Sequence, residues 1–153
     1  KNAEHARIVT SIVSNQSWFL DSGWSFLPIH NVTHSEVARL LSDSSIFLSF
    51  GFPEGFGLPL AESIVSGNIV VGYDGIGGRE IFNLCRPYDT FLSCEYRDFN
   101  AFCSGIRSAV NQYNEISSLA SRLQASSSLL SSHFSYESMV SSVKYVLFSL
   151  DLI

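Results

Sequence analysis

The chain has 153 residues, a length typical of one domain, and 46% of them are hydrophobic whereas only 15% are charged. Because the usual charged fraction is about a quarter, we expect part of this surface to be covered in the intact protein. The net charge of −5, without any basic stripe, argues against a nucleic-acid partner. No apolar run approaches the roughly 20 residues that a membrane-spanning helix needs.

Cysteines and histidines show no spacing typical of a metal site or a disulfide framework. The three cysteines form no CxxC pair, and the four histidines form neither HxH nor HxxxH. No DxD pair, the usual carboxylate grip on a metal-bound diphosphate, occurs either. We therefore expect reduced thiols, no metal ion, no cofactor and a cytoplasmic location. The residues concerned are Cys85, Cys94, Cys103, His5, His30, His34 and His133.

Helical and extended patterns alternate along the first two-thirds of the chain. Thr33 and Glu36 form a capping box, in which Thr33 caps a helix and Glu36 reaches back. Gly67 follows an apolar helical run and is expected as its C′ residue. The alternation predicts an α/β fold, a Rossmann-like parallel sheet flanked by helices. The expected elements are helix 3–13, polar turn 15–23, strand 24–29, helix 33–42, strand 45–50, helix 58–66, strand 68–72, helix 79–83 and strand 90–93.

The last third of the chain is predicted to be helical from Phe99 onward, in two or three pieces rich in serine. Serine clusters predict a helix end near His133, and Ser135 is expected to cap a final helix that runs to about Leu150. Without a repeat or an interdomain linker, residues 1–153 are predicted to form a single domain. Because the sequence starts at Lys1 rather than at a methionine, we expect a fragment of a longer protein.

Two carboxylates eight residues apart, Glu54 and Glu62, flank a loop with two glycines, a phenylalanine and a proline. Glu54 follows a predicted strand, where ligands of open α/β sheets bind, and Glu62 lies in the next helix. Bare backbone at Gly55 and Gly57 permits close approach of a ligand, and the helix N-terminus favours anions. These groups suit a nucleotide sugar. The alternatives are a solvated loop acid, an ordinary first-turn helix acid at Glu62, and a core aromatic at Phe56.

A second glycine-rich loop, residues 72–78, leads from a predicted strand into a helix, which is the context of a phosphate contact. Glycine pairs such as Gly77-Gly78 also mark ordinary turns. Because this loop comes one strand–helix unit after the first, we expect both loops at the same edge of the sheet.

The segment from Glu54 to Glu62 resembles the E-x7-E motif of retaining glycosyltransferases of the GT-B fold, notably those of family GT4. The similarity covers roughly residues 24–83, including the helix and strand before the motif and a GGxxE-like turn after it, and extends loosely into the helical tail. It implies one half of a GT-B fold with a helical C-terminal segment. This half would bind a UDP-, GDP- or ADP-linked sugar for transfer of a hexosyl group with retention.

The resemblance implies a role for each residue that matches the motif. Glu54 would be the catalytic residue, in contact with donor-sugar hydroxyls beside the reacting carbon. The backbone N–H groups of Phe56 and Gly57 would hold the sugar, and that of Leu58 would hold a phosphate. Glu62 would accept hydrogen bonds from both ribose hydroxyls. Catalysis would be electrostatic, because fixed donors stabilise the charge that the leaving diphosphate gains.

Asn31 and Val32 match the place where the family meets the nucleotide base, and Gly77 and Gly78 belong to the later turn of the donor site. The family's leading strand and its basic diphosphate clamp, of which Lys1 would be at most the last residue, are not in this sequence. Neither is the N-terminal acceptor domain, which would also carry any peripheral membrane association. A non-catalytic nucleotide-sugar-binding module and a sugar-nucleotide epimerase-type enzyme of similar fold stay open as alternatives.

Overall fold

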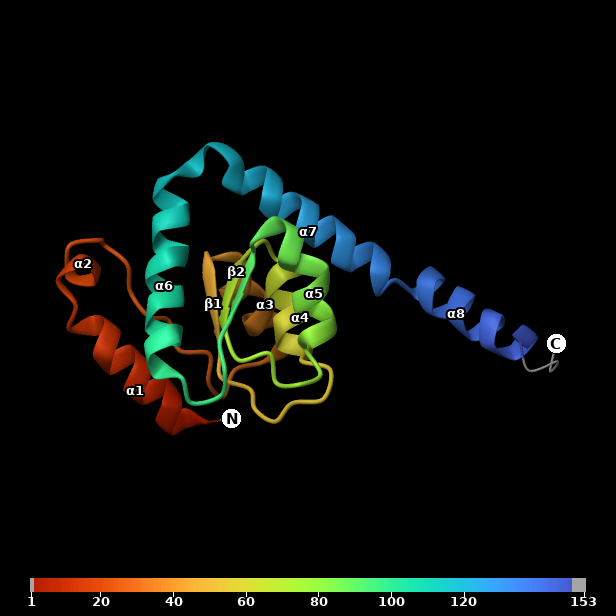
Figure 1. The fold of residues 1–153 in the computed structure, drawn as a ribbon, viewed down its shortest axis with the longest axis horizontal. Coiled ribbons are helices and arrows are strands. Elements are labelled where there is room, and N and C mark those ends of the chain that lie inside the picture. Colours follow the sequence, from red (N-terminus) through yellow and green to blue (C-terminus); the bar gives the residue numbers. More distant parts are fainter. Residues whose placement is uncertain (1, 150–153) are drawn as a thin grey trace.

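The computed structural model describes residues 2–149, which form a parallel sheet between two layers of helices (Figure 1). In this part of the chain the strand order is β1-β2-β3, with Ile46 opposite Ile69 and Val70 opposite Phe91. The strands are β1 (Ile46–Ser49), β2 (Ile69–Gly72) and β3 (Phe91–Ser93). The α-helices are α1 (Ala3–Ser14), α2 (Ser17–Leu20), α3 (His34–Ser42), α4 (Leu58–Val65), α5 (Arg79–Cys85), α6 (Phe99–Asn114), α7 (Leu119–His133) and α8 (Tyr136–Ser149). The predicted α/β class with a parallel sheet is confirmed.

The central strand β2 is buried on both faces and sends alternate side chains into two cores. Ile69 and Val71 pack in a cluster with residues of α1, α2 and α6. Val70, on the other face, packs with residues of α4, α5 and α7, and Figure 1 shows these two helix layers on opposite sides of the sheet. A strand covered on both faces is a continuous apolar run, which is why it could be located from the sequence.

The strand predicted at residues 24–29 is wrong, because this segment is irregular and pairs with no strand of the described chain. Its aromatic side chains pack on helices instead. The Trp24 ring lies 5.5 Å from that of Tyr113 in α6, and Phe26 stacks on Phe19 in α2 at 4.9 Å, measured between ring centroids. Trp24 and Phe26 are therefore partly buried by packing on helices, without strand pairing, whereas Leu27 and Ile29 are exposed.

Two local predictions near the N-terminal helices need correction. The polar turn at residues 15–23 contains the short helix α2, which the buried side chain of Phe19 anchors to the core. The capping box before α3 is only half formed. Thr33 Oγ1 accepts a hydrogen bond from Glu36 N at 3.3 Å as predicted, but the Glu36 carboxylate accepts from Arg39 at 2.7 Å instead of reaching back. The guanidinium is the stronger, charged donor.

The helical tail follows the prediction closely. α7 ends at His133, and Ser135 Oγ accepts from Ser138 N at 3.1 Å, which caps α8. Leu150, the predicted end of that helix, lies outside the described residues, as does Lys1. α8 projects away from the sheet and its helices, and none of its described residues is buried (Figure 1). Among the described helices, none is both long and apolar enough to cross a bilayer.

Candidate functional site at the carboxyl edge of the sheet

Two loops meet at the carboxyl edge of the sheet, as predicted. The first loop, residues 50–57, follows β1, and the second loop, residues 73–78, follows β2. Glu54 N donates to Gly75 O at 2.8 Å, Gly77 N donates to Glu54 O at 3.3 Å, and a parallel bridge joins Glu54 to Ile76. The two loops therefore extend the sheet pairing by one short step beyond the strands.

The glycines of the second loop are required by contact with the first loop. A Cβ atom added at Gly75 would lie 2.6 Å from Glu54 Cβ, and one added at Gly77 would overlap the Gly55 carbonyl. The N–H groups of Gly77 and Gly78 already donate, the latter to Asp74 O at 2.8 Å. Close packing of backbone on backbone explains this glycine cluster without a ligand.

The first loop is open at Gly55, whereas Gly57 is buried and lies against Leu60. A Cβ atom added at Gly55 would meet no atom within 4 Å. Within the described residues, the N–H groups of Phe56, Gly57 and Leu58 donate to no protein acceptor. Gly57 caps α4 with a left-handed φ of 78° and offers no side chain for the helix N-terminus. Unused donors at a helix N-terminus are a ready anion site.

Glu62 is a partly buried acid in the second turn of α4. The alternative of a first-turn acid is wrong, because α4 starts at Leu58 and has no acid in its first turn. The dipole effect is concentrated in that first turn and therefore does not account for this carboxylate. No side-chain hydrogen bond or ion pair of Glu62 occurs within the part of the chain that the structure describes.

Glu54 is partly buried between the two loops. Its Cβ lies against Gly75, and a side chain at Gly51 would overlap its Oε2. The backbone of Glu54 is bonded to the second loop on both sides, at Gly75 and Gly77. This residue is therefore fixed by the loop pair rather than being a solvated loop acid. Its carboxylate points back along the first loop toward Gly51.

Phe56 is 40% exposed, so the alternative of a core aromatic is wrong. Its ring makes an edge-to-face contact with Phe134, with 4.9 Å between ring centroids. Leu58, also exposed, begins α4 beside it. These apolar side chains border the open N-terminus of α4.

Asn31 and Val32 lie in the exposed segment that leads to α3. Asn31 has a left-handed φ of 52°, and its amide lies 3.0 Å from His30 Nε2. No hydrogen bond, ion pair or ring contact between described residues joins this segment to either loop. A base-binding role for Asn31 and Val32 stays a prediction.

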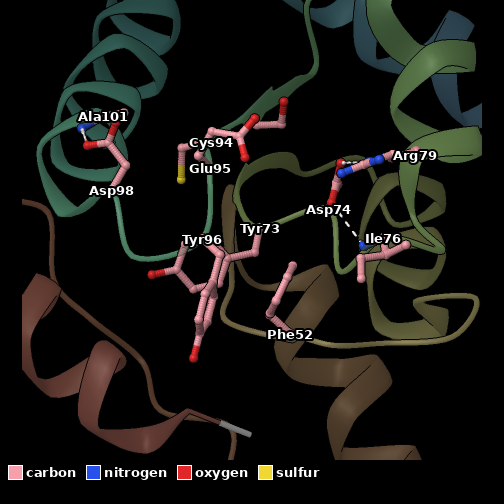
Figure 2. Close-up of a pocket in the computed structure, with 11 residues that line it drawn as sticks. Phe52, Tyr73, Asp74, Ile76, Arg79, Cys94, Glu95, Tyr96, Asp98 and Ala101 are labelled. Carbon is pink, nitrogen blue, oxygen red and sulfur yellow. Dashed lines mark hydrogen bonds and ion pairs between the residues drawn. The ribbon is translucent and has the colours of Figure 1, made fainter.

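A cavity of about 400 Å³ adjoins the loops where β2 and β3 end (Figure 2). Phe52 of the first loop, Asp74 and Ile76 of the second, and Cys94 and Tyr96 after β3 are among its lining residues. The Phe52 and Tyr96 rings stack at 4.1 Å between centroids. This cavity was not predicted from the sequence. The signal in the sequence was the polar and aromatic segment directly after the strand predicted at residues 90–93.

The polar groups of this cavity mainly serve the fold. Asp74 accepts from Ile76 N at 2.9 Å and from Arg79 Nε at 3.0 Å, and Asp98 caps α6 by accepting from Ala101 N at 2.9 Å (Figure 2). Burial, and next the nearby carboxylates of Asp98 and Glu95, raise the pKa of Cys94 to about 12. The Cys94 thiol therefore stays neutral near pH 7 and is a poor nucleophile.

Metal ligands do not gather at this edge. Within residues 2–149, no group of three or more histidine, cysteine, aspartate or glutamate side chains is placed to hold a metal ion. All three cysteines are free thiols.

Comparison with known proteins points to glycosyltransferases. The chain is 39% identical over 99 residues, 60% of its length, to a protein named as a glycosyltransferase (ORF330) from Acidianus filamentous virus 2, isolate Italy/Pozzuoli. It is 39% identical over 59 residues, 39% of its length, to an alpha-1,6-glucosyltransferase from Actinobacillus pleuropneumoniae serotype 7, strain AP76. No family model and no solved structure matches. The two relatives support a glycosyltransferase family for this chain.

The chain spans only a small part of these curated relatives. The matched segments cover 30% of the viral protein and 17% of the bacterial one.

Proposed function

We propose that this chain is the donor-binding half of a GT-B, GT4-like retaining glycosyltransferase, and that it binds a nucleotide diphosphate sugar at the first loop and α4. The observation that carries the proposal is the set of unused N–H donors at Phe56, Gly57 and Leu58, beside the open face of Gly55. The names of the two relatives, both glycosyltransferases, support the glycosyltransferase part of this proposal.

The unused N–H groups and the two acids fit different parts of a nucleotide diphosphate sugar. The N–H groups of Phe56 and Gly57 bind sugar oxygens, and that of Leu58, at the N-terminus of α4, binds a phosphate. Glu62, one turn further along the helix, accepts from the ribose hydroxyls, because a carboxylate can accept two hydrogen bonds from a vicinal diol. Glu54, fixed between the loops, contacts the sugar hydroxyls next to the reacting carbon.

Transfer in this proposal depends on electrostatic stabilisation. The diphosphate gains negative charge as it leaves, and N–H donors that are already oriented stabilise this charge without reorganising. Gly77 and Gly78 contribute by keeping the second loop close enough to hold Glu54 in place. Asn31 and Val32 would contact the base. No metal ion or cofactor is required.

The binding experiment is a thermal-shift panel of UDP-, GDP- and ADP-linked sugars on the 153-residue chain. A ligand at a hundred times its dissociation constant stabilises a protein by about 2.7 kcal/mol, so binding is detectable without turnover. We expect one nucleotide series to raise the melting temperature and the Glu62→Ala variant to lose most of that shift. Absence of any shift across the panel would contradict the proposal.

We further propose that this chain alone does not transfer sugar. Catalysis needs donor and acceptor in near-attack geometry, and one wall of a cleft cannot hold both. The test incubates the chain with radiolabelled donors and a mixed acceptor pool, beside a longer protein that includes it. Slow donor hydrolysis is the most that we expect from the chain. Glycosylated product at a rate close to that of the longer protein would show that the acceptor site lies within these residues.

A further inference from the structure

We propose that Phe134, at the joint between α7 and α8, is a positioning residue for the first loop and thereby for the donor sugar. This inference rests on the proposed function. Phe134 lies 78 positions after Phe56 in the sequence, yet the two rings meet edge to face at 4.9 Å between centroids and 81° between planes. Edge-to-face packing is a favoured geometry, because the positive ring edge meets the negative ring face.

The part of the first loop around Phe56 has few contacts that hold it in place. Its second-loop side is fixed by the hydrogen bonds of Glu54, and Gly57 O accepts from Leu60 N at 2.8 Å, but between them Phe56 makes no backbone hydrogen bond within the described residues. Phe56 is 40% exposed and Phe134 is 39% exposed, so neither ring is fixed by a surrounding core. The ring pair is therefore a side-chain contact that holds Phe56 itself against the end of α7.

The joint that carries Phe134 is itself anchored. His133 Nε2 lies 3.3 Å from Glu80 Oε1 of α5, and Phe134 N donates to Leu130 O at 3.0 Å. Farther back in α7, Ser127 Oγ donates to Val65 O at 2.9 Å and so attaches α7 to the end of α4. α7 thus bridges α5 and the C-terminus of α4, and places a ring beside the N-terminus of the same helix.

Because the Phe56 and Gly57 N–H groups bind the sugar in our proposal, a looser turn should weaken sugar binding selectively. Ordering a mobile loop on binding costs free energy, and a preformed loop avoids that cost. Glu62 lies inside α4, whose helical hydrogen bonds do not depend on the ring pair. Contacts to the ribose should therefore survive loss of the Phe134 ring.

The experiment measures affinities of Phe134→Ala and Phe134→Tyr by calorimetry. The probes are the nucleotide sugar that shifts the wild-type chain most and the corresponding nucleoside monophosphate. Loss of an aromatic pair predicts roughly two- to tenfold weaker binding of the nucleotide sugar by Phe134→Ala and less than a twofold change for the monophosphate. Phe134→Tyr keeps the ring edge and should restore the wild-type affinity. Tyr145→Ala on α8, which removes a ring that is 75% exposed, is the matched control.

Each outcome decides a separate question. If the wild-type chain binds no nucleotide sugar, the proposed function fails before Phe134 is tested. If it binds and Phe134→Ala leaves both affinities unchanged, the positioning role is wrong. Equal weakening for both probes would also overturn it, because that result reports general loosening of the fold. Should Phe134→Ala not fold, Phe134→Leu replaces it, since leucine keeps apolar volume without a ring edge.

Discussion

Two glycine-rich loops lie side by side at the carboxyl edge of the sheet, but glycine is needed for a different reason in each. In the second loop, Gly75 and Gly77 face the backbone of the first loop, and the N–H groups of Gly77 and Gly78 are already bonded. In the first loop, Gly55 faces open space. Similar sequence patterns thus serve internal packing in one loop and leave room for a ligand in the other.

The largest expected effect concerns the packed loop. Gly77→Ala places a methyl group on the carbonyl of Gly55, and backbone on both sides leaves little freedom to relax. We expect a loss of about 3 kcal/mol or more in the free energy of unfolding, measured by urea denaturation. A loss below about 1 kcal/mol would show that the two loops can separate easily.

Removal of the Glu62 carboxylate tests whether the N-terminal part of α4 binds the nucleotide. Glu62→Ala should weaken binding of the nucleotide by roughly ten- to a hundredfold, because a charge-assisted hydrogen bond contributes about 1.5–3 kcal/mol. Calorimetry with UDP and GDP measures this change. Glu137→Ala removes the same charge from the exposed start of α8 and is the control. Unchanged nucleotide affinity in Glu62→Ala would show that Glu62 does not bind the ribose.

Gly55→Ala is the counterpart of Gly77→Ala in the open loop. The added methyl group meets no protein atom within 4 Å, so stability should change by less than about 0.5 kcal/mol. The same methyl group should obstruct a ligand that approaches the backbone, and we expect roughly tenfold weaker binding of the nucleotide sugar, about 1.4 kcal/mol. A stable variant with wild-type affinity would show that the space at Gly55 is not used.

A smaller effect concerns the reactivity of Cys94, which lines the cavity beside the two loops. The pKa of the Cys94 thiol is raised to about 12, chiefly by burial, whereas a thiol of the unfolded chain has a pKa of about 8.5. The folded state therefore retains the proton longer. The resulting stability is complete below about pH 8.5 and is lost as the pH rises toward 12. At pH 9, iodoacetamide should alkylate Cys94 far more slowly in the folded than in the urea-unfolded protein, as measured by mass spectrometry.

The sequence predicted the central part of the fold because its signals are local or additive. β2 is a continuous apolar run bounded by Asn68 and a glycine, and Gly67 ends α4 with a φ of 86°. The order of strands and helices was sufficient to place both loops at one edge. The adjacency of the loops needed no knowledge of side-chain contacts.

The failures concern interactions between distant segments. Whether residues 24–29 form a strand depends on a neighbouring strand to pair with, and the aromatic side chains of Trp24 and Phe26 pack on α6 and α2 instead. The sequence could not show that Gly77 meets Gly55, or that Phe56 meets Phe134. The exposed apolar residues of α8, such as Tyr136 and Phe148, agree with the low charged fraction, but composition does not locate such a surface.

The most direct test of the difference between the loops is backbone amide NMR of the 153-residue chain during titration with the nucleotide sugar that the thermal-shift panel selects. We expect the amide signals of Phe56, Gly57 and Leu58 to shift most, because their N–H groups acquire acceptors. Those of Gly77 and Gly78 should shift less, because these N–H groups keep their backbone partners. Large shifts at Gly77 and Gly78 with unchanged signals in the first loop would show that the second loop, and not the first, binds the ligand.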